Sequence, residues 1–325
     1  MTRVPIGVEN RILVEKPGLR TTMQDAGRAG WAHLGVPPSG AVDALSRRLA
    51  NALVGNHDDA AVLETTLAGP TLRFGADTVV AVTGAPCPVD IDDEPVMLGV
   101  ALPVRAGQLL TIGRASVGLH TYVAVGGGFA VQRVLGSRST DTLSGLGPPP
   151  LAAGDVLETD VATNGDVIKR SAAADLLRFV LDGGRRPVRL LVGPGADWLT
   201  KDAEELLYSS EFVVSPASDR VGVRLAGPVL GRSREGELDS QGMVNGAVQL
   251  PPDGAPIVLL ADHAVTGGYP VVGVVATIDV PLVAQARPGT ALRFVRTSFE
   301  SARAALAEQD TQLLRWRRGR TEQEQ

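Results

Sequence analysis

The chain has 325 residues and a formal net charge of −5, with 44% hydrophobic and 21% charged residues. Its 38 glycines and 22 prolines indicate many turns, and this composition excludes a coiled coil, a helical bundle and a disordered chain. The acidic balance argues against a nucleic acid or an anionic membrane as partner. A single cysteine, Cys87, excludes an internal disulfide and a zinc site built from cysteines. Without a secretory signal or a long apolar run, we expect a cytoplasmic protein.

The first element that the pattern predicts is a helix over residues 41–54, with Ser39 as its N-cap and Gly55 as its stop. Short runs of β-branched and aliphatic residues that end at Gly, Pro or Asp then predict strands. These strands cover residues 78–83, 121–125, 189–192 and 256–260.

Two further helices are predicted in the second half of the chain. A short polar helix covers residues 201–209 after Thr200. A longer one runs from about Ser298 to Arg318 and begins with a capping box formed by Thr297 and Glu300. Together these elements predict a mostly β fold, largely antiparallel, with a few helices.

A weak internal repeat bears on the domain organisation. The string AGPTL at residues 68–72 is echoed by AGPVL at residues 226–230. The echo arises either from ordinary turn sequences or from two related β-barrel units in tandem. We place a first β-barrel subdomain at 10–160, a linker at 161–187, a second β-barrel subdomain at 188–297 and a C-terminal helix and tail at 298–325.

Standard catalytic motifs are missing from the sequence. It has no phosphate-binding P-loop, no G-x-S-x-G nucleophile elbow and no H-E-x-x-H zinc motif. The four histidines lack the spacing of metal ligands, so no metal site is expected. Candidate functional residues must therefore come from the polar loops.

The first candidate loop covers residues 35–43, GVPPSGAVD. Ser39 and Asp43 lie just before or within the first turn of the predicted helix. Plain helix capping would explain both residues. A rigid loop that presents them to a ligand would explain them as well.

The second candidate loop covers residues 135–140, LGSRST. Arg138 between Ser137 and Ser139 offers a planar guanidinium and two hydroxyls, which suit a carboxylate or a phosphate. A surface turn with a structural arginine remains the alternative.

The third group lies in the C-terminal half, where polar residues stand in or beside apolar strands. A buried polar side chain needs a partner, which is either structural or a ligand, so several together make a lined cleft plausible. The group consists of Gln249, Asp262, Thr266, Tyr269 and Gln285.

Five strings occur in order along the chain: EKPGLRTTMQDAGR at 15–28, GVPPSGAVD at 35–43, LGSRST at 135–140, GAVQLPPDGAPI at 246–257 and TGGYP at 266–270. With these strings the chain resembles, over about residues 12–296, the biotin-dependent carboxyltransferase family. This family includes KipA, the so-called allophanate hydrolase subunit 2 and part of the carboxyltransferase region of urea carboxylase. The resemblance implies two tandem cyclophilin-like β-barrel subdomains and a KipI-like (PxpB) partner subunit, with a PxpA (LamB/YcsF-like) subunit as a further partner.

For a free-standing chain of this length, the resemblance implies one subunit of an ATP-dependent 5-oxoprolinase that is inactive alone. ATP, with Mg²⁺, would act at the level of the complex. Arg138 would hold a carboxylate or phosphoryl oxygen together with Ser137 and Ser139. Asp43 or Asp262 would serve as general base. Substrate-binding roles would fall to Ser39, Gln249, Thr266, Tyr269 and Gln285.

Two other functions fit the same family. One is the carboxyltransferase component of a biotin-dependent system that acts on urea or a similar amide. No biotin is expected on this chain itself, since none of its lysines follows a methionine. The other is a KipA-like regulator that binds a KipI-type kinase inhibitor.

Overall fold

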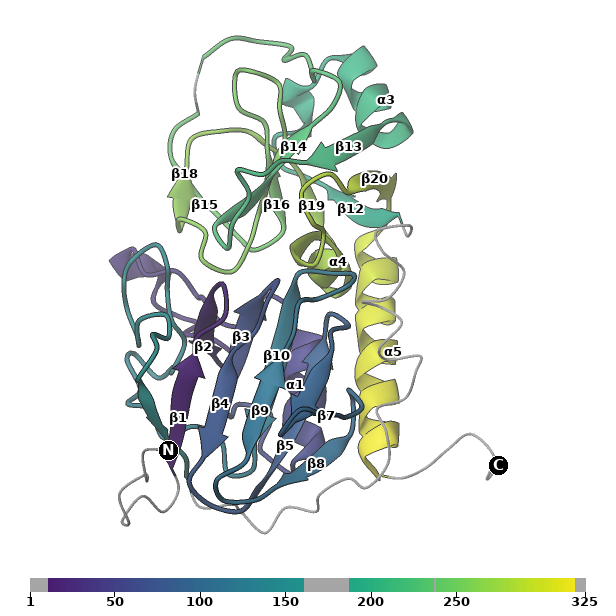
Figure 1. Ribbon diagram of the computed structural model, residues 1–325. Helices are drawn as coiled ribbons and strands as arrows, with labels where there is room; N and C mark the ends of the chain where they lie inside the picture. Colours follow the sequence, from purple (N-terminus) through teal and green to yellow (C-terminus); the bar gives the residue numbers. More distant parts are fainter. Residues whose placement is uncertain (1–10, 161–186, 237, 319–325) are drawn as a thin grey trace. The chain divides into compact units, whose positions relative to one another are not determined.

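The computed structural model describes residues 11–160, 187–236 and 238–318 (Figure 1). The chain divides into two compact units that are interleaved in the sequence. Segments 28–43 and 141–145 belong to the second unit, although both fall within the 10–160 span predicted for the first domain. The predicted linker, 161–187, lies outside the described residues except for its last residue, and so does the tail after Arg318.

The first unit is built from two antiparallel sheets. The six-stranded sheet has the order β11 (Val156–Glu158), β1 (Arg11–Lys16), β4 (Thr71–Phe74), β9 (Leu109–Ile112), β6 (Val89–Ile91) and β7 (Glu94–Pro95). The five-stranded sheet has the order β2 (Thr21–Gln24), β3 (Val62–Thr66), β10 (His120–Val125), β5 (Thr78–Gly84) and β8 (Ala101–Val104).

One apolar core lies between these two sheets, because alternate residues of each strand point to the same face. Val14 and Leu72 contribute from the six-stranded sheet, and Leu63 and Val123 from the five-stranded sheet. All four are fully buried. The strands that the sequence predicts at 78–83 and 121–125 are β5 and β10.

The helix α1 (Ala44–Leu53) packs on β10, β5 and β3. The hydroxyl of Thr83 on β5 donates a hydrogen bond to the carbonyl of Ser46 at 2.7 Å. Strand β10 is buried along its whole length, since the core covers one face and α1 packs on the strand as well.

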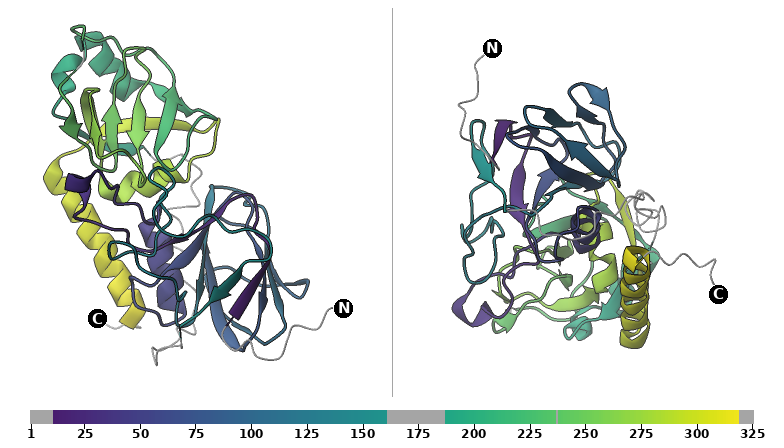
Figure 2. Two further views of the ribbon diagram at one scale, coloured as in Figure 1. Left: turned by 90° about the vertical axis from the view of Figure 1, so that its left-hand side faces the viewer. Right: turned by 90° about the horizontal axis from the view of Figure 1, so that it is seen from below.

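The second unit contains a closed barrel of seven strands (Figures 1 and 2). Every pair around the barrel is antiparallel except β12 with β20, which is parallel. The order is β12 (Val188–Val192), β19 (Val271–Val275), β16 (Ala247–Gln249), β17 (Ile257–Leu259), β14 (Gly222–Ala226), β13 (Glu211–Val214) and β20 (Ala291–Arg296). A separate two-stranded ribbon pairs β15 (Gln241–Gly242) with β18 (Thr266–Gly267).

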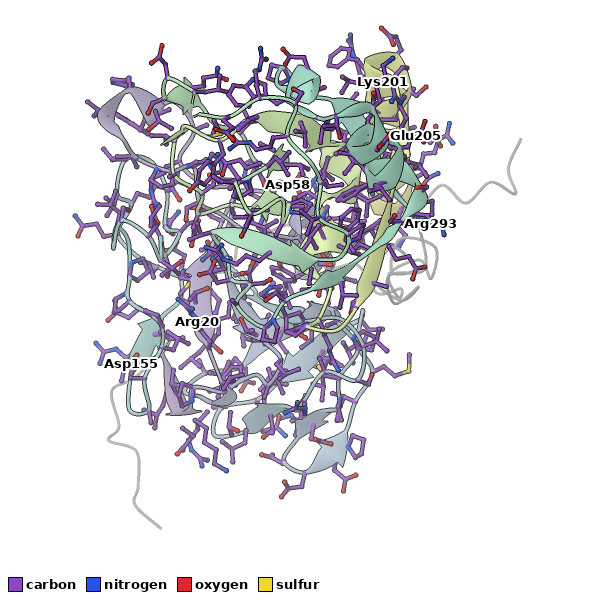
Figure 3. All side chains as sticks on the ribbon, turned by 90° about the horizontal axis from the view of Figure 1, so that it is seen from above. Arg20, Asp58, Asp155, Lys201, Glu205 and Arg293 are labelled. Carbon is purple, nitrogen blue, oxygen red and sulfur yellow. The ribbon has the colours of Figure 1, made fainter. Side chains whose placement is uncertain are left out.

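Short helices accompany the barrel. They are η1 (Ala32–Leu34), η2 (Ala196–Trp198), α3 (Lys201–Ser209), η3 (Thr277–Asp279), α4 (Val280–Ala284) and the longer α5 (Phe299–Arg318). The helix α3 packs against β20, and α5 packs against η3. Lys201 and Glu205 stand exposed on α3, and Arg293 stands exposed on β20 (Figure 3). Within the described residues no helix is long and apolar enough to span a membrane.

The mostly β fold predicted from the sequence is confirmed, with a closed barrel in the second unit and two sheets in the first. The predicted helices at 201–209 and about 298–318 form with nearly the same bounds. The predicted cap of the last helix is wrong by one residue: Ser298, not Thr297, accepts the hydrogen bond from the Ser301 backbone at 3.1 Å.

Two buried polar clusters and the candidate functional site

The loop at 135–140 is organised by a residue that the sequence analysis did not single out. Asp25 follows β2 and is completely buried. Its Oδ1 atom accepts hydrogen bonds from the hydroxyls of Ser137 and Ser139 at 2.6 and 2.7 Å, and from the Gly27 backbone at 2.8 Å. Its Oδ2 atom accepts one from the Arg138 backbone at 2.6 Å. We call Asp25, Ser137, Arg138 and Ser139 the Asp25 cluster.

Both serine hydroxyls of this cluster also accept hydrogen bonds. Ser139 Oγ accepts from the Asp25 backbone at 3.0 Å, and Ser137 Oγ accepts from the Ser139 backbone at 2.9 Å. Because their donors and acceptors serve the loop itself, the geometry favours a positioning role over direct ligand binding for both serines. Leu135 at the start of the loop has φ 52°, a strained conformation for a residue with a Cβ.

The Arg138 side chain is half-buried beside this cluster. Its Nε atom donates to the Val131 carbonyl at 2.9 Å, and its Nη2 atom lies 3.8 Å from a carboxylate oxygen of Asp160. Asp160 is largely exposed, so this ion pair is weak. Arg138 therefore keeps the chemistry expected of an anion-binding residue, held on a loop that Asp25 fixes.

The second unit contains a comparable centre around Asp262, which follows β17 and is completely buried. Arg220 makes a bidentate ion pair with it, from Nε to Oδ2 at 3.0 Å and from Nη2 to Oδ1 at 3.1 Å. The Ser39 hydroxyl donates to Oδ1 at 2.6 Å. Thr142 donates to Oδ2 from its backbone at 3.0 Å and its hydroxyl at 2.7 Å. We call these four residues the Asp262 cluster.

These contacts decide what Asp262 can do. Burial of the carboxyl opposes its charge, but the Arg220 guanidinium and the hydroxyls of Ser39 and Thr142 outweigh burial and hold the pKa of Asp262 below its ordinary value. A carboxylate with a lowered pKa and five donors is a poor proton acceptor. The geometry thus favours a positioning role for Asp262 over the general base that the sequence suggested.

Ser39 likewise differs from its expected role as a helix cap. Its hydroxyl is committed to Asp262, 223 positions further along the chain, and its backbone N–H donates to the Ala261 carbonyl at 3.0 Å. Its φ of 54° is in the left-handed region, where the surrounding contacts must hold a non-glycine residue. Arg220 Nη2 also donates to the carbonyl of the next residue, Gly40, at 2.7 Å. The loop at 35–43 is therefore fixed to the barrel.

The predicted residues Asp43 and Gln285 come together in the second unit. Gln285 follows α4, and its Nε2 atom donates to Asp43 Oδ2 at 3.0 Å. Both side chains are buried. The sequence contained both residues as candidates but gave no indication that they form a pair.

The remaining candidates lie at the β15–β18 ribbon and the barrel strand β16. Gln249 is the last residue of β16 and is 8% exposed. Thr266 is exposed on β18, and Tyr269 is half-buried just after it. The register places Gly242 opposite Thr266 in the ribbon.

Three functional candidates were missed at the sequence level. Asp25 and Arg220 form the centres described above, and Arg28 lies 3.9 Å from Asp141 in a fully buried ion pair. Asp25 and Arg28 stand within the string at 15–28 that carried the family resemblance, so their presence there was the available signal. Arg220 lies outside all five strings on which the family resemblance depends, so the sequence offered no signal for it.

Both clusters have the same construction: a buried carboxylate fixes a strained polar loop by several hydrogen bonds. Rigid presentation of polar groups is what substrate binding and catalysis require. In the part of the chain that the structure describes, no group of three or more His, Cys, Asp or Glu side chains is arranged to hold a metal ion.

Comparison with known proteins agrees with this architecture. Residues 34–296 match the family described as "Carboxyltransferase domain, subdomain A and B". The chain therefore belongs to this carboxyltransferase family, as the strings in the sequence indicated.

Individual relatives show how much of each known protein the chain matches. The chain is 38% identical over 310 residues to the 5-oxoprolinase C subunit of Escherichia coli (strain K12), covering 93% of this chain and 97% of that protein. It is 34% identical to the urea amidolyase of Lachancea kluyveri over 91% of this chain but only 17% of that protein. The crystal structure of the K. lactis urea amidolyase matches with a TM-score of 0.88 and 30% identity, over 94% of this chain and 20% of that chain. The chain thus corresponds to a whole subunit in one case and to about a fifth of a larger enzyme in the others.

Proposed function

We propose that this chain is one subunit of an ATP-dependent 5-oxoprolinase, which opens the lactam of 5-oxoproline to give glutamate. The observation that carries the proposal is the match to a 5-oxoprolinase C subunit along 97% of that protein at 38% identity. The matches to urea amidolyases cover about a fifth of much longer chains. The 5-oxoprolinase C subunit therefore carries the proposal, because the match extends over nearly its whole length.

The chemistry requires activation of the amide. Resonance stabilises the lactam, so water alone attacks its carbonyl carbon slowly. Transfer of the γ-phosphoryl group of ATP to the lactam oxygen would make the carbonyl carbon more electrophilic and release ADP. Water would then add to this carbon, and the ring C–N bond would break as the nitrogen takes up a proton. A second water molecule would hydrolyse the resulting γ-glutamyl phosphate to glutamate and phosphate. Such a reaction depends on positioning and on stabilisation of anionic oxygens.

Each cluster would position groups for this chemistry within its own unit. In the first unit, Arg138 would hold a carboxylate or a phosphoryl oxygen, since its guanidinium has a planar fork of donors. Asp43 is our candidate for the general base, because Asp262 is committed to Arg220. Ser39, Ser137 and Ser139 would fix the loops, while Thr266 and Tyr269 would contact the substrate near the ribbon.

We further propose that a KipI-like partner completes the active site and that ATP acts at the level of the complex. The sequence has no P-loop to hold the nucleotide. The Escherichia coli relative is by its name one subunit of a 5-oxoprolinase, which denotes a protein that works with others. An association of this kind should bury about 1,600 Å² or more and survive gel filtration.

The test is reconstitution. The purified chain is assayed for ATP-dependent conversion of 5-oxoproline to glutamate, first alone and then with its neighbouring gene products. We expect activity only in the assembled complex. Full activity of the chain alone would refute the shared site, and tight association without any turnover would refute the 5-oxoprolinase assignment.

A second function is favoured by one specific observation, the TM-score of 0.88 with the K. lactis urea amidolyase. In this alternative the chain would transfer a carboxyl group from a biotin carrier to urea or a similar amide. A biotinylated polypeptide that copurifies with the chain, together with loss of activity on addition of avidin, would support it over 5-oxoproline hydrolysis.

A further inference from the structure

Gln249 has a buried amide group whose hydrogen-bonding capacity is largely unused. Its side chain is 8% exposed, and its Nε2 atom donates to the thioether sulfur of Met243 at 3.4 Å. A thioether is a weak acceptor, and a side-chain amide has two N–H donors and an oxygen with two lone pairs. Within the described residues no group donates a hydrogen bond to the Gln249 Oε1 atom. A ligand that donates to this atom would supply the hydrogen bond that a side-chain amide normally makes.

The backbone around Gln249 is shaped to place this amide. The register of β16 with β19 shifts between Val248 and Gln249, so that Val248 lies opposite Gly273 and Gln249 opposite Val271. The ribbon strand β18 comes so close that a Cβ on Gly267 would lie 2.6 Å from Gln249 Nε2. Only a residue without a side chain leaves room for the amide in this position.

We propose that Gln249 recognises the amide edge of the substrate, an inference that rests on the proposed function. The lactam of 5-oxoproline is a cis amide, so its N–H and its C=O lie on the same edge of the ring. The Gln249 Oε1 atom would accept the lactam N–H, and the second N–H of Nε2 would donate to the lactam oxygen. This pair of hydrogen bonds is the usual complement between two amides, and Met243 occupies the other N–H of Nε2.

Such a contact would serve specificity as well as affinity. A binding site that hydrogen-bonds an N–H and a C=O rejects a ring that lacks them, because its own buried polar atoms would then stay unpaired. The position of Gln249 against Gly267, the residue that follows the candidate Thr266, agrees with this role.

The first test replaces the side-chain amide of Gln249 by a carboxylate in the reconstituted complex. Gln249→Glu keeps the shape and an acceptor for the lactam N–H, but it removes the donor and places a negative charge beside the lactam oxygen. We expect the KM for 5-oxoproline to rise about ten- to a hundredfold, with a smaller change in kcat. The matched control is Gln241→Glu on the exposed ribbon strand β15, which makes the same change of charge and should leave the KM unchanged.

A second pair of variants leaves Gln249 in place. Gly267→Ala would displace the amide, whereas Gly242→Ala in the paired strand has no atom within 4 Å of the added Cβ. Neither glycine has a positive φ, so alanine fits both backbones. We expect the Gly267 variant to share the raised KM and the Gly242 variant to behave as wild type.

Cyclopentanecarboxylate, tested as a competitive inhibitor, separates loss of amide recognition from general damage to the site, because it has the ring and the carboxylate but no amide edge. Its inhibition constant should stay unchanged in the Gln249 and Gly267 variants. If the KM changes by less than about threefold in both variants, or rises in parallel with the inhibition constant, the inference is overturned although the proposed function stands. If the wild-type complex does not hydrolyse 5-oxoproline at all, the proposed function fails and the inference fails with it.

Discussion

Removal of the charge on Asp262 should destabilise the second unit strongly. In Asp262→Asn the side chain keeps its size, but the Arg220 guanidinium, whose side chain is 4% exposed, loses its counter-charge. Removal of one partner of a buried ion pair costs about 3–5 kcal/mol, since the other charge stays buried without compensation. The hydroxyls of Ser39 and Thr142 would also lose a charged acceptor.

A surface ion pair in the same unit provides the matched control. Asp197 pairs with Arg234, and these side chains are 65% and 50% exposed. Solvent screens such a pair, so Asp197→Asn should cost no more than about 1 kcal/mol. The same Asp→Asn change is thus made at a buried and at an exposed position. The difference in the free energy of unfolding between the two variants gives the effect of burial, because both lose a carboxylate.

The measurement is urea-induced unfolding followed by tryptophan fluorescence. All three tryptophans, Trp31, Trp198 and Trp316, belong to the second unit, so the signal reports on the unit that contains the Asp262 cluster. We expect a large fall in the unfolding midpoint for Asp262→Asn and little change for Asp197→Asn. A loss below about 1 kcal/mol in both variants would refute the reasoning.

The dependence on pH gives a second readout of the same carboxylate. Because the folded-state pKa of Asp262 is lowered, its contribution to stability is complete above the unfolded-state pKa of about 3.9 and is lost as the pH falls through the lower folded-state value. Wild-type stability should therefore decline in this acidic range, and this component of the decline should be absent in Asp262→Asn. An identical acid profile in both proteins would contradict the assignment.

Three further predictions concern single positions. Arg138→Lys should lower turnover of the assembled enzyme about ten- to a hundredfold with little change in the unfolding midpoint. Near wild-type kinetics would show that the loop at 135–140 has only a structural role. Burial raises the pKa of the Cys87 thiol, so iodoacetamide should alkylate the native protein much more slowly than the urea-unfolded chain at neutral pH, and equal rates would show that the thiol is accessible. Ser298→Ala should cost about 1 kcal/mol of stability because it removes the N-cap of α5, whereas Thr297→Ala should cost almost nothing, and the reverse order in urea unfolding would restore the predicted capping box.

The local elements of this fold could be predicted from the sequence. The helix at 201–209 begins after Thr200, whose hydroxyl accepts from the Ala203 backbone at 3.2 Å. The strands β5 and β10 coincide with runs of β-branched residues. These features depend on neighbours within a few positions along the chain, so periodicity and capping residues are enough to locate them.

The connections between distant segments were decided by the tertiary structure. Ser39 looked like a helix cap because capping is a local pattern, but its hydroxyl binds a carboxylate 223 positions away. Asp25 carries no local signal of its own, yet it holds a loop more than a hundred positions further along. The sequence thus identified the loops at 35–43 and 135–140, whereas the fold decided which carboxylates hold them. Only packing of the whole unit brings such partners together and removes the water that would otherwise satisfy them.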